Sequence, residues 1–173
     1  MHKLLLNRAI YEDFVKTEIP AARHYVWIVT ADIKDLHVET DRGFEPFLAV
    51  LAELVSRGVA VRLIHAKEPG PVFREEFDRF DALISNELFE RILCPRVHTK
   101  AVVIDNRLAF VGSANLTGAG MGSKHPDKRN FEAGMVFDDP QQIAELCHWV
   151  DELYLGELCR DCRRREHCPD PIA

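Results

Sequence analysis

The sequence predicts an α/β domain in which helices cover both faces of a mixed β-sheet. Short runs of β-branched and aromatic residues alternate with segments whose apolar residues recur every three or four positions. Residues 44–56 and 59–64 also form a helix–glycine–strand passage around Gly58, which is typical of a crossover between parallel strands. The chain has 173 residues, enough for one hydrophobic core. We expect a single domain over residues 1–156 and a short tail, 157–173, rich in cysteine and arginine.

The position of each element follows from its local pattern. Helical periodicity predicts helices at 8–19, 44–56, 73–83 and 140–155. Apolar runs bounded by turn residues predict strands at 25–30, 59–64, 97–104, 108–111 and 131–137. Asp139 and Pro140 supply an N-cap and a first-turn proline for the last helix. Glycine and charge dominate residues 118–130, which we interpret as a loop, whereas the stretch from 84 to 95 has no decided pattern.

Charge and hydropathy narrow the function classes. The formal net charge of −6 does not favour a general nucleic-acid-binding domain, so a polyanionic ligand would need a local basic patch. The longest apolar runs are too short for a membrane span or for the core of a signal peptide. We therefore expect a cytoplasmic protein without a membrane partner, whose five cysteines are free or metal-bound rather than paired in disulfides.

One predicted hairpin, within residues 98–117, gathers polar residues suited to an anion. His98 and Lys100 are two apart on a strand, so both point to the same face. If Asn106 and Arg107 form a two-residue turn, His98 lies opposite Asn115 and Lys100 lies opposite Ser113.

Such a cluster suits phosphoryl transfer. Lysine provides a point charge for a phosphate oxygen, and serine and asparagine donate hydrogen bonds as charge builds on phosphorus. A neutral imidazole can attack phosphorus, and an imidazolium can protonate a leaving oxygen, but one histidine cannot do both at once.

The residues form the pattern H-x-K-x4-D-x6-G-S-x-N, complete at His98, Lys100, Asp105, Gly112-Ser113 and Asn115. This resembles the HKD motif of the phospholipase D superfamily. The glutamate that the family often places downstream has a match in Glu132, and the likeness extends over residues 44–137. The resemblance implies a phospholipase D-like fold and a phosphodiesterase.

The family normally brings two motifs to one active site, and only one is complete here. The H-x-K spacing of His65 and Lys67 lacks the later aspartate and Gly-Ser. A short chain with one motif resembles the metal-independent endonucleases of the family, which pair two subunits across a two-fold axis. We therefore expect a homodimer that needs no cofactor for catalysis.

By this resemblance, His98 of one subunit forms a phosphohistidine and His98 of the other protonates the leaving group. Lys100 and Asn115 hold the phosphate with support from Ser113, and Glu132 orients the imidazole. Asp105 belongs to the motif, but its place at the turn indicates a mainly structural role.

The substrate is open at this stage. The superfamily also contains phospholipid phosphodiesterases, including cardiolipin hydrolases, and a catalytically inactive module that binds phosphate or nucleic acid is a further alternative. No amphipathic membrane-contact element is evident around residues 98–130. Lys124, Lys128 and Arg129 form a local basic cluster, which is either a solvated loop or a clamp for a nucleic-acid backbone. We therefore favour a nuclease on DNA or RNA.

The tail has the character of a structural metal site. Cys159, Cys162, His167 and Cys168 are spaced like zinc ligands, although adjacent His167 and Cys168 are awkward partners on one ion. Cys147 or Cys94 could be the fourth ligand instead, and four thiolates could hold an iron–sulfur cluster. Free thiols are the alternative. The neighbouring arginines at 160 and 163–165 could touch nucleic acid or simply be solvated.

Overall fold

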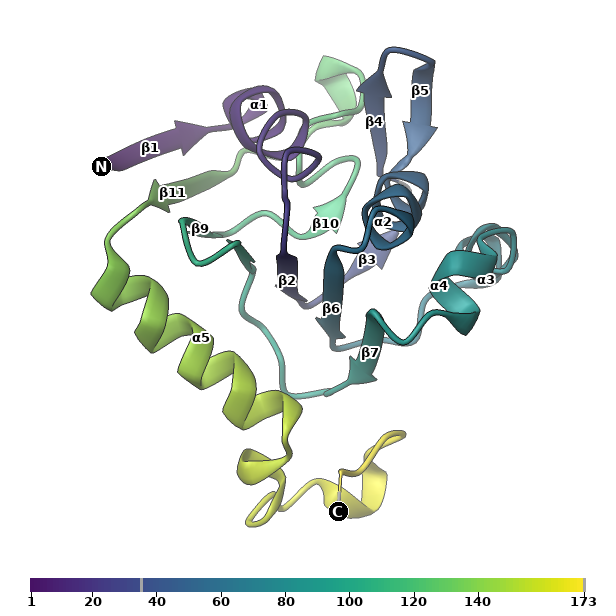
Figure 1. Cartoon of the computed structure of the whole chain (residues 1–173), viewed down its shortest axis with the longest axis vertical. Helices are drawn as coiled ribbons and strands as arrows, with labels where there is room; N and C mark the ends of the chain where they lie inside the picture. Colours follow the sequence, from purple (N-terminus) through teal and green to yellow (C-terminus); the bar gives the residue numbers. More distant parts are fainter. Residues whose placement is uncertain (35, 173) are drawn as a thin grey trace.

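A computed structural model describes residues 1–34 and 36–172 of the chain. In this part, a seven-stranded sheet has the order β1-β11-β9-β8-β2-β6-β7, and two smaller sheets pair β10 with β3 and β4 with β5 (Figure 1). β2, β6 and β7 are parallel, whereas the neighbours from β2 through β8, β9 and β11 to β1 are antiparallel. The predicted class, a mixed sheet in an α/β fold, is confirmed.

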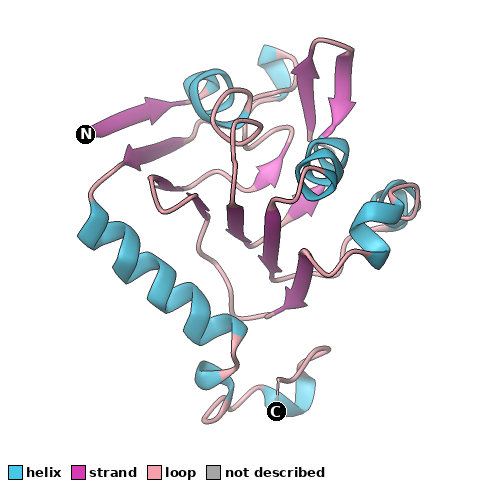
Figure 2. Ribbon diagram, in the orientation of Figure 1, coloured by secondary structure: helices cyan, strands magenta, loops and turns pink. Residues whose placement is uncertain are grey.

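The bounds of the elements are as follows. The large sheet contains β1 (His2–Leu6), β2 (Tyr25–Thr30), β6 (Ala60–His65), β7 (Phe89–Leu93), β8 (Ala101–Ile104), β9 (Leu108–Gly112) and β11 (Ala133–Phe137). The small sheets contain β3 (Ile33–Lys34), β4 (His37–Thr40), β5 (Gly43–Pro46) and β10 (Leu116–Thr117). The helices, cyan in Figure 2, are α1 (Arg8–Ile10), α2 (Phe47–Ser56), α3 (Pro71–Phe77), α4 (Asp81–Ser85) and α5 (Pro140–Tyr154). The short turns are the π-helical η1 (Tyr11–Val15) and the 3₁₀-helical η2 (Pro126–Lys128), η3 (Glu157–Cys159) and η4 (Arg165–His167).

Helices cover both faces of the large sheet, as predicted. On one face, η1 and α2 pack into the main core, where the Phe14 ring of η1 stacks on Phe110 of β9 with centroids 5.1 Å apart. The helix α5 lies on the other face (Figure 1). Its residue Ile143 packs in one cluster with Val103 of β8. Asp139 caps α5 by accepting a hydrogen bond from the backbone N–H of residue 142 at 2.9 Å.

Three predicted helices differ from the observed ones. The helix expected at 8–19 is α1 followed by η1, and it ends at Val15. The helix expected at 44–56 begins only at Phe47, because Pro46 disfavours a helical conformation in the residue before it and residues 43–46 pair in β5. The helix expected at 73–83 is split into α3 and α4, because Phe80 takes a non-helical conformation with φ −110° and ψ 87°.

Several strands were shorter than predicted or were missed. The strand expected at 97–104 begins at Ala101, and the strand expected at 131–137 begins at Ala133. β7 lies in the stretch that had no decided pattern. β1 was missed because it is an edge strand of which only Leu5 is buried, so its sequence lacks a clear two-residue alternation.

The predicted register of the β8–β9 hairpin is wrong by one residue. Ile104 pairs with Leu108 and Ala101 with Val111, so Lys100 lies beside Gly112 rather than Ser113, and Gly112 N–H donates to Lys100 O at 3.0 Å. The loop has three residues, 105–107, instead of the two assumed, and Asp105 (φ 52°) and Asn106 (φ 54°) are left-handed. Aspartate and asparagine tolerate positive φ better than most residues do, which allows this loop.

Candidate active site

His98 and Lys100 lie on the connection that leads into β8. Val97 N–H donates to Cys94 O at 2.9 Å, which closes a turn immediately before His98. The Lys100 ammonium donates to His98 O at 2.6 Å and lies 3.3 Å from Nδ1 of the same histidine. His98 is exposed, whereas Lys100 is only 7% exposed. The structure therefore brings these two motif residues together, with the imidazole open to a substrate.

The buried charge of Lys100 has no carboxylate partner. Within residues 1–34 and 36–172, no aspartate or glutamate oxygen lies within ion-pair distance of its ammonium group, whose hydrogen bonds go to His98. Lys100 lines a small internal space together with Thr30, Ala114 and Met121. An ammonium group on a mostly buried residue without a counter-ion can take an anionic ligand as its partner. The site is therefore preorganised for an anion that the protein itself does not provide.

Ser113 and Glu132 form a second polar pair beside the end of β9. Ser113 Oγ donates to a carboxylate oxygen of Glu132, and it accepts from Ala133 N–H at 3.1 Å. The other oxygen of Glu132 accepts from Asn130 Nδ2 at 3.0 Å. Glu132 thus lies just before β11, not on it, and its hydrogen bonds go to Ser113 and Asn130. The expected role of Glu132 in orienting the imidazole stays a prediction.

Asn115 lies on the turn between β9 and β10. Thr117 N–H donates to Asn115 O at 2.7 Å, and Leu116 N–H donates to the Thr30 hydroxyl at 3.1 Å. The side-chain Oδ1 of Asn115 is buried and has no hydrogen-bond partner among the described residues. An unpaired buried acceptor is unusual in a folded protein, and it often marks a functional position.

Two glycines allow the strands beside the site to approach each other. Gly112 of β9 pairs with Gly134 of β11, and the fully buried Phe110 ring lies against both. A Cβ atom on Gly112 would come within 2.7 Å of the Phe110 ring and of Ala133 O, and one on Gly134 would come within 2.2 Å of the ring. The glycine of the motif is therefore a packing requirement that fixes where Ser113 emerges.

Asp105 lies in the turn between β8 and β9, at the opposite end of the hairpin from His98. Its carboxylate accepts backbone N–H bonds from Arg23, His24 and Tyr25 at 2.8–2.9 Å, and its side chain is 6% exposed. Burial alone would raise its pKa, but these three bonds hold the pKa below the ordinary value of an aspartate. These contacts join the hairpin turn to the start of β2, away from His98.

The basic loop connects the turn at Asn115 with Glu132. Lys128 is exposed at its tip on η2, and Arg129 is half-buried and donates through Nε to Lys124 O. Asn130 N–H donates to Ala119 O at 3.1 Å, so the loop closes on itself beside the site. The three basic residues at 124, 128 and 129 are therefore close in sequence to the motif. Arg129 uses its Nε atom for a hydrogen bond within the loop.

Two supporting residues escaped the sequence analysis. Asn7 Oδ1 accepts from Glu132 N–H at 3.0 Å, and Asn7 adopts a left-handed φ of 51°. Thr30 is 2% exposed, and besides receiving Leu116 N–H it donates to Asp32 O at 2.9 Å. Both residues are distant from the motif in sequence, and no local pattern identifies them.

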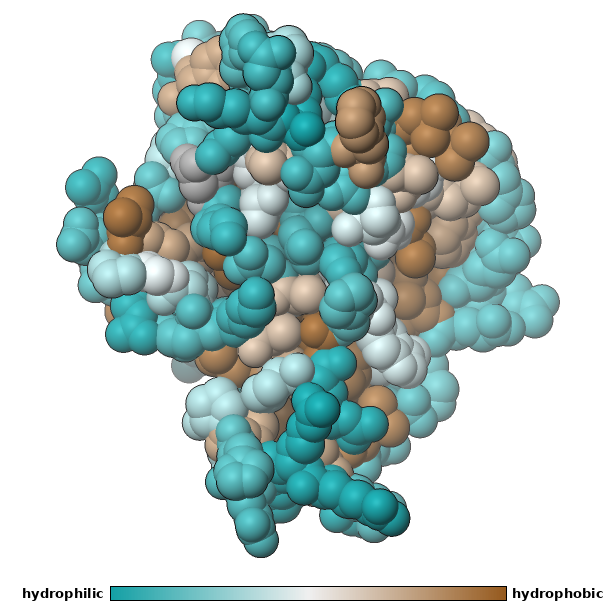
Figure 3. All heavy atoms as spheres, turned by 180° about the vertical axis from the view of Figure 1, so that it is seen from behind, coloured by the Kyte–Doolittle hydropathy of each residue, from teal (hydrophilic) through white to brown (hydrophobic). Residues whose placement is uncertain are grey.

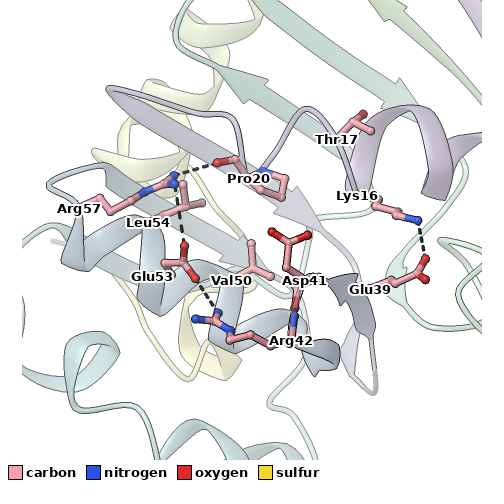
Figure 4. A pocket seen from close by; sticks show the side chains of 11 residues that line it. Lys16, Thr17, Pro20, Glu39, Asp41, Arg42, Val50, Glu53, Leu54 and Arg57 are labelled. Atoms are coloured by element: carbon pink, nitrogen blue, oxygen red, sulfur yellow. Dashed lines mark hydrogen bonds and ion pairs between the residues drawn. The ribbon is translucent and has the colours of Figure 1, made fainter.

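A pocket of about 650 Å³ lies away from the motif, between η1, the end of β4 and α2 (Figure 4). Its charged side chains pair with one another: Lys16 contacts Glu39, and Glu53 contacts Arg42 at 2.7 Å and Arg57 at 4.0 Å. Because its charges are mutually compensated, this pocket is not a second anion site.

The tail does not assemble the predicted metal ligands. In the described part of the chain, no group of three or more histidine, cysteine, aspartate or glutamate side chains is spaced to hold an ion. Cys159, Cys162 and Cys168 are half-buried thiols outside any disulfide, and His167 is exposed. Cys147 lies elsewhere, within 3.8 Å of the Tyr25 hydroxyl and 3.7 Å of Asn106 Oδ1.

Comparison with known proteins agrees with this fold. Residues 15–154 match the model of the family described as "Cardiolipin synthase, PLD-like domain". The chain therefore belongs to the phospholipase D-like phosphodiesterase superfamily. The sequence gives no significant match to a curated protein.

Solved structures with this fold include two short proteins. NucT from Helicobacter pylori has a TM-score of 0.67 at 16% identity, and the phospholipase D family member Nuc from Salmonella typhimurium has a TM-score of 0.61 at 18% identity. In both cases the match covers 89% of this chain and 95% of the other. The archaeal chromatin protein TrmBL2 matches with a TM-score of 0.58 at 15% identity, over 88% of this chain and 52% of that one. At these identities the likeness shows the fold alone.

No helix among the described residues is long and apolar enough to cross a membrane.

Proposed function

We propose that the protein is a homodimeric nuclease that cleaves DNA or RNA through a phosphohistidine, without a catalytic metal. The observation that carries this proposal is the buried Lys100 ammonium, which has no carboxylate partner in the described chain and lies 3.3 Å from the exposed His98 imidazole. A phosphodiester supplies the missing negative charge and places its phosphorus next to a nucleophile.

An uncovered apolar face supports the dimer. α5 covers one end of its side of the sheet, over Ala109 and Phe137, but leaves the other end open. There, Leu4, Met135 and Val111 lie directly opposite one another on β1, β11 and β9, with exposed fractions of 57%, 38% and 38%. Figure 3 shows apolar surface gathered on the side that carries β1 and β11.

This face adjoins the motif, so we assign it to a second copy of the chain. Val111 pairs with Ala101, the residue after Lys100, and Ala133 lies beside Ser113. Phe131, which is 97% exposed, extends the apolar surface next to Glu132. Two such faces related by a two-fold axis bury apolar area and bring two motifs toward one phosphate.

The chemistry then divides between the two histidines. Nε2 or Nδ1 of one His98 attacks phosphorus, the bond to the leaving oxygen breaks, and the partner subunit's His98 gives that oxygen a proton. Water then attacks phosphorus, the P–N bond of the phosphohistidine breaks and frees the first His98, and the now neutral partner imidazole takes the proton of that water. Lys100 and Asn115 of both subunits stabilise the charge on the phosphate oxygens, and Ser113 supports them.

The loop residues Lys124, Lys128 and Arg129 favour a nucleic-acid substrate, because they place basic side chains in the segment that joins Asn115 to Glu132. The family description names a lipid-related enzyme, which makes a phospholipid the second candidate.

The deciding assay incubates the protein in chelator with labelled DNA, RNA and cardiolipin vesicles, while circular dichroism monitors the fold. We expect cleavage of nucleic acid; cleavage of cardiolipin alone would overturn the substrate assignment.

A mixed dimer tests the shared site. A wild-type subunit joined to a His98→Asn subunit has one histidine, so it can form the covalent adduct but lacks the acid for an alkoxide leaving group. We expect the adduct with loss of turnover, and an Asp127→Asn mixed dimer serves as control because that side chain is 86% exposed. Half the wild-type rate in the His98 heterodimer would show that each subunit has a complete site.

A further inference from the structure

Four of the five cysteines gather where the C-terminal tail meets the turn in front of His98. The Cys94 thiol interacts electrostatically with those of Cys159 and Cys168. The Arg96 side chain, two residues after Cys94, hydrogen-bonds Cys162. These two contacts bring thiols from residues far apart in sequence to one side of the molecule.

Backbone contacts hold the tail at this place. Leu93 N–H donates to Asp170 Oδ2 at 3.1 Å, which ties the end of β7 to the end of the tail. Arg165 donates to Ile172 O at 2.9 Å, and Ile172 lies so close to Gly156 that a Cβ atom there would come within 2.5 Å of it. The tail is therefore a closed loop lying beside the β7–β8 connection, as its yellow trace in Figure 1 shows.

The tail has no core of its own. Neither η3 nor η4 contains a buried residue, and both are single turns. Segments of this kind usually need a cross-link or a metal ion to hold one conformation. Cys162 N–H donates to Cys159 O at 3.1 Å, which puts the two cysteines of the C-x-x-C pair on one tight turn, as thiolate metal sites commonly do.

We propose that Cys94, Cys159, Cys162 and Cys168 form a four-thiolate metal site that fastens the tail to the turn before His98. The site takes either one zinc ion or an iron–sulfur cluster, since both accept four cysteine thiolates. The set replaces the exposed His167 with Cys94 and leaves out Cys147, which contacts Tyr25 and Asn106 at the hairpin turn. In the described chain no three of these side chains are spaced to hold an ion. The proposal therefore requires that a bound metal draw the four thiols closer together.

The site has a consequence for the candidate active site. Cys94 lies four residues before His98, and Val97 N–H already bonds Cys94 O. A metal on Cys94 therefore restrains the backbone that carries His98. Both readouts below, metal content and thiol protection, are independent of cleavage, so a failure of this proposal is distinguishable from a failure of the proposed nuclease activity.

The first experiment uses the intact wild-type chain prepared under reducing, oxygen-free conditions. Elemental analysis should give one zinc per chain in a colourless protein, or iron with acid-labile sulfide in a coloured one. A thiol reagent should modify one cysteine in the native protein and five after chelation and unfolding, because the chain has five cysteines. Five reactive thiols without bound metal, or a Cys94 disulfide to the tail in freshly prepared protein, would overturn the proposal.

Matched variants locate the ligands. Cys94→Ser and Cys159→Ser should lose the metal, whereas Cys147→Ser and His167→Ala should keep the wild-type content. If a ligand variant fails to fold, cobalt substitution in the wild type gives the answer, since thiolate-to-cobalt charge-transfer bands report sulfur ligation. Loss of metal in His167→Ala with full retention in Cys94→Ser would instead place the site within the tail and refute the present set.

Discussion

Replacing Asp105 by alanine removes the acceptor of three backbone N–H groups, and this should destabilise the fold without direct damage to the chemistry. The carboxylate binds Arg23, His24 and Tyr25 at the start of β2, while its own residue sits at φ 52°. Two of these bonds are at exposed positions, where water can partly replace the acceptor, so each contributes about 1 kcal/mol. An alanine in the left-handed region costs about 1 kcal/mol more.

The expected loss in the free energy of unfolding is therefore about 4 kcal/mol for Asp105→Ala, a large part of the stability of an ordinary domain. Asp105→Asn keeps one oxygen for His24 and Tyr25 and tolerates positive φ, so its loss should be about 1–2 kcal/mol. Urea unfolding measures both values. Asp127→Asn, at an exposed loop position, is the matched control and should change stability little.

Activity separates a structural role from a catalytic one. At a temperature where Asp105→Asn is fully folded, we expect its turnover to stay within a few-fold of wild type, because its contacts are at the opposite end of the hairpin from His98. A folded Asp105→Asn protein that lost activity by two orders of magnitude would refute this reasoning and would place Asp105 in the catalytic machinery.

Three further predictions concern single positions. Lys100→Met keeps the packing of the buried aliphatic stem and removes a charge that has no counter-ion. Thermal melting should therefore show unchanged or higher stability, while turnover falls at least ~100-fold. A decrease in both stability and turnover would indicate a structural role for the lysine. Gly134→Ala should cost about 1–3 kcal/mol in urea unfolding, because its Cβ would lie 2.2 Å from the Phe110 ring; a neutral result would show that the ring can move. Burial, and secondarily Arg91, lowers the pKa of His65 to about 4, so the unfolded state takes up its proton first near pH ~6.5. The contribution of His65 to the free energy of unfolding is therefore complete above that pH and falls by about 2 kcal/mol between pH 7 and 5. Urea unfolding at several pH values should show this decrease in the wild type and not in a folded His65→Asn protein.

Most of the elements could be predicted because their signals are local. Three local signals lie within a few residues of the structure that they specify: the runs of β-branched and other apolar residues in β2 and β6, the glycine at 58 between α2 and β6, and the Asp139-Pro140 start of α5. The edge strand β1 could not be predicted, since pairing with β11 and not its own pattern makes it a strand. The same holds for β10, which is two residues long and exists through its pairing with β3.

The sequence by itself determined the superfamily and the identity of the candidate catalytic residues, because the spacing of the motif from His98 to Asn115 is a property of the chain and survives a wrong register. Tertiary structure alone decided how those residues are presented. With Asp105 and Asn106 in left-handed conformations, the register of the β8–β9 hairpin differs by one residue from the predicted one. Packing of Gly112 against the Phe110 ring sets the position of Ser113, the next residue. Whether Lys100 is exposed or buried, and whether a carboxylate neutralises it, depends on how other parts of the chain, such as those that carry Thr30 and Met121, enclose it. Electrostatic energy depends on distances and on the exclusion of water, and these quantities exist only after the chain has folded.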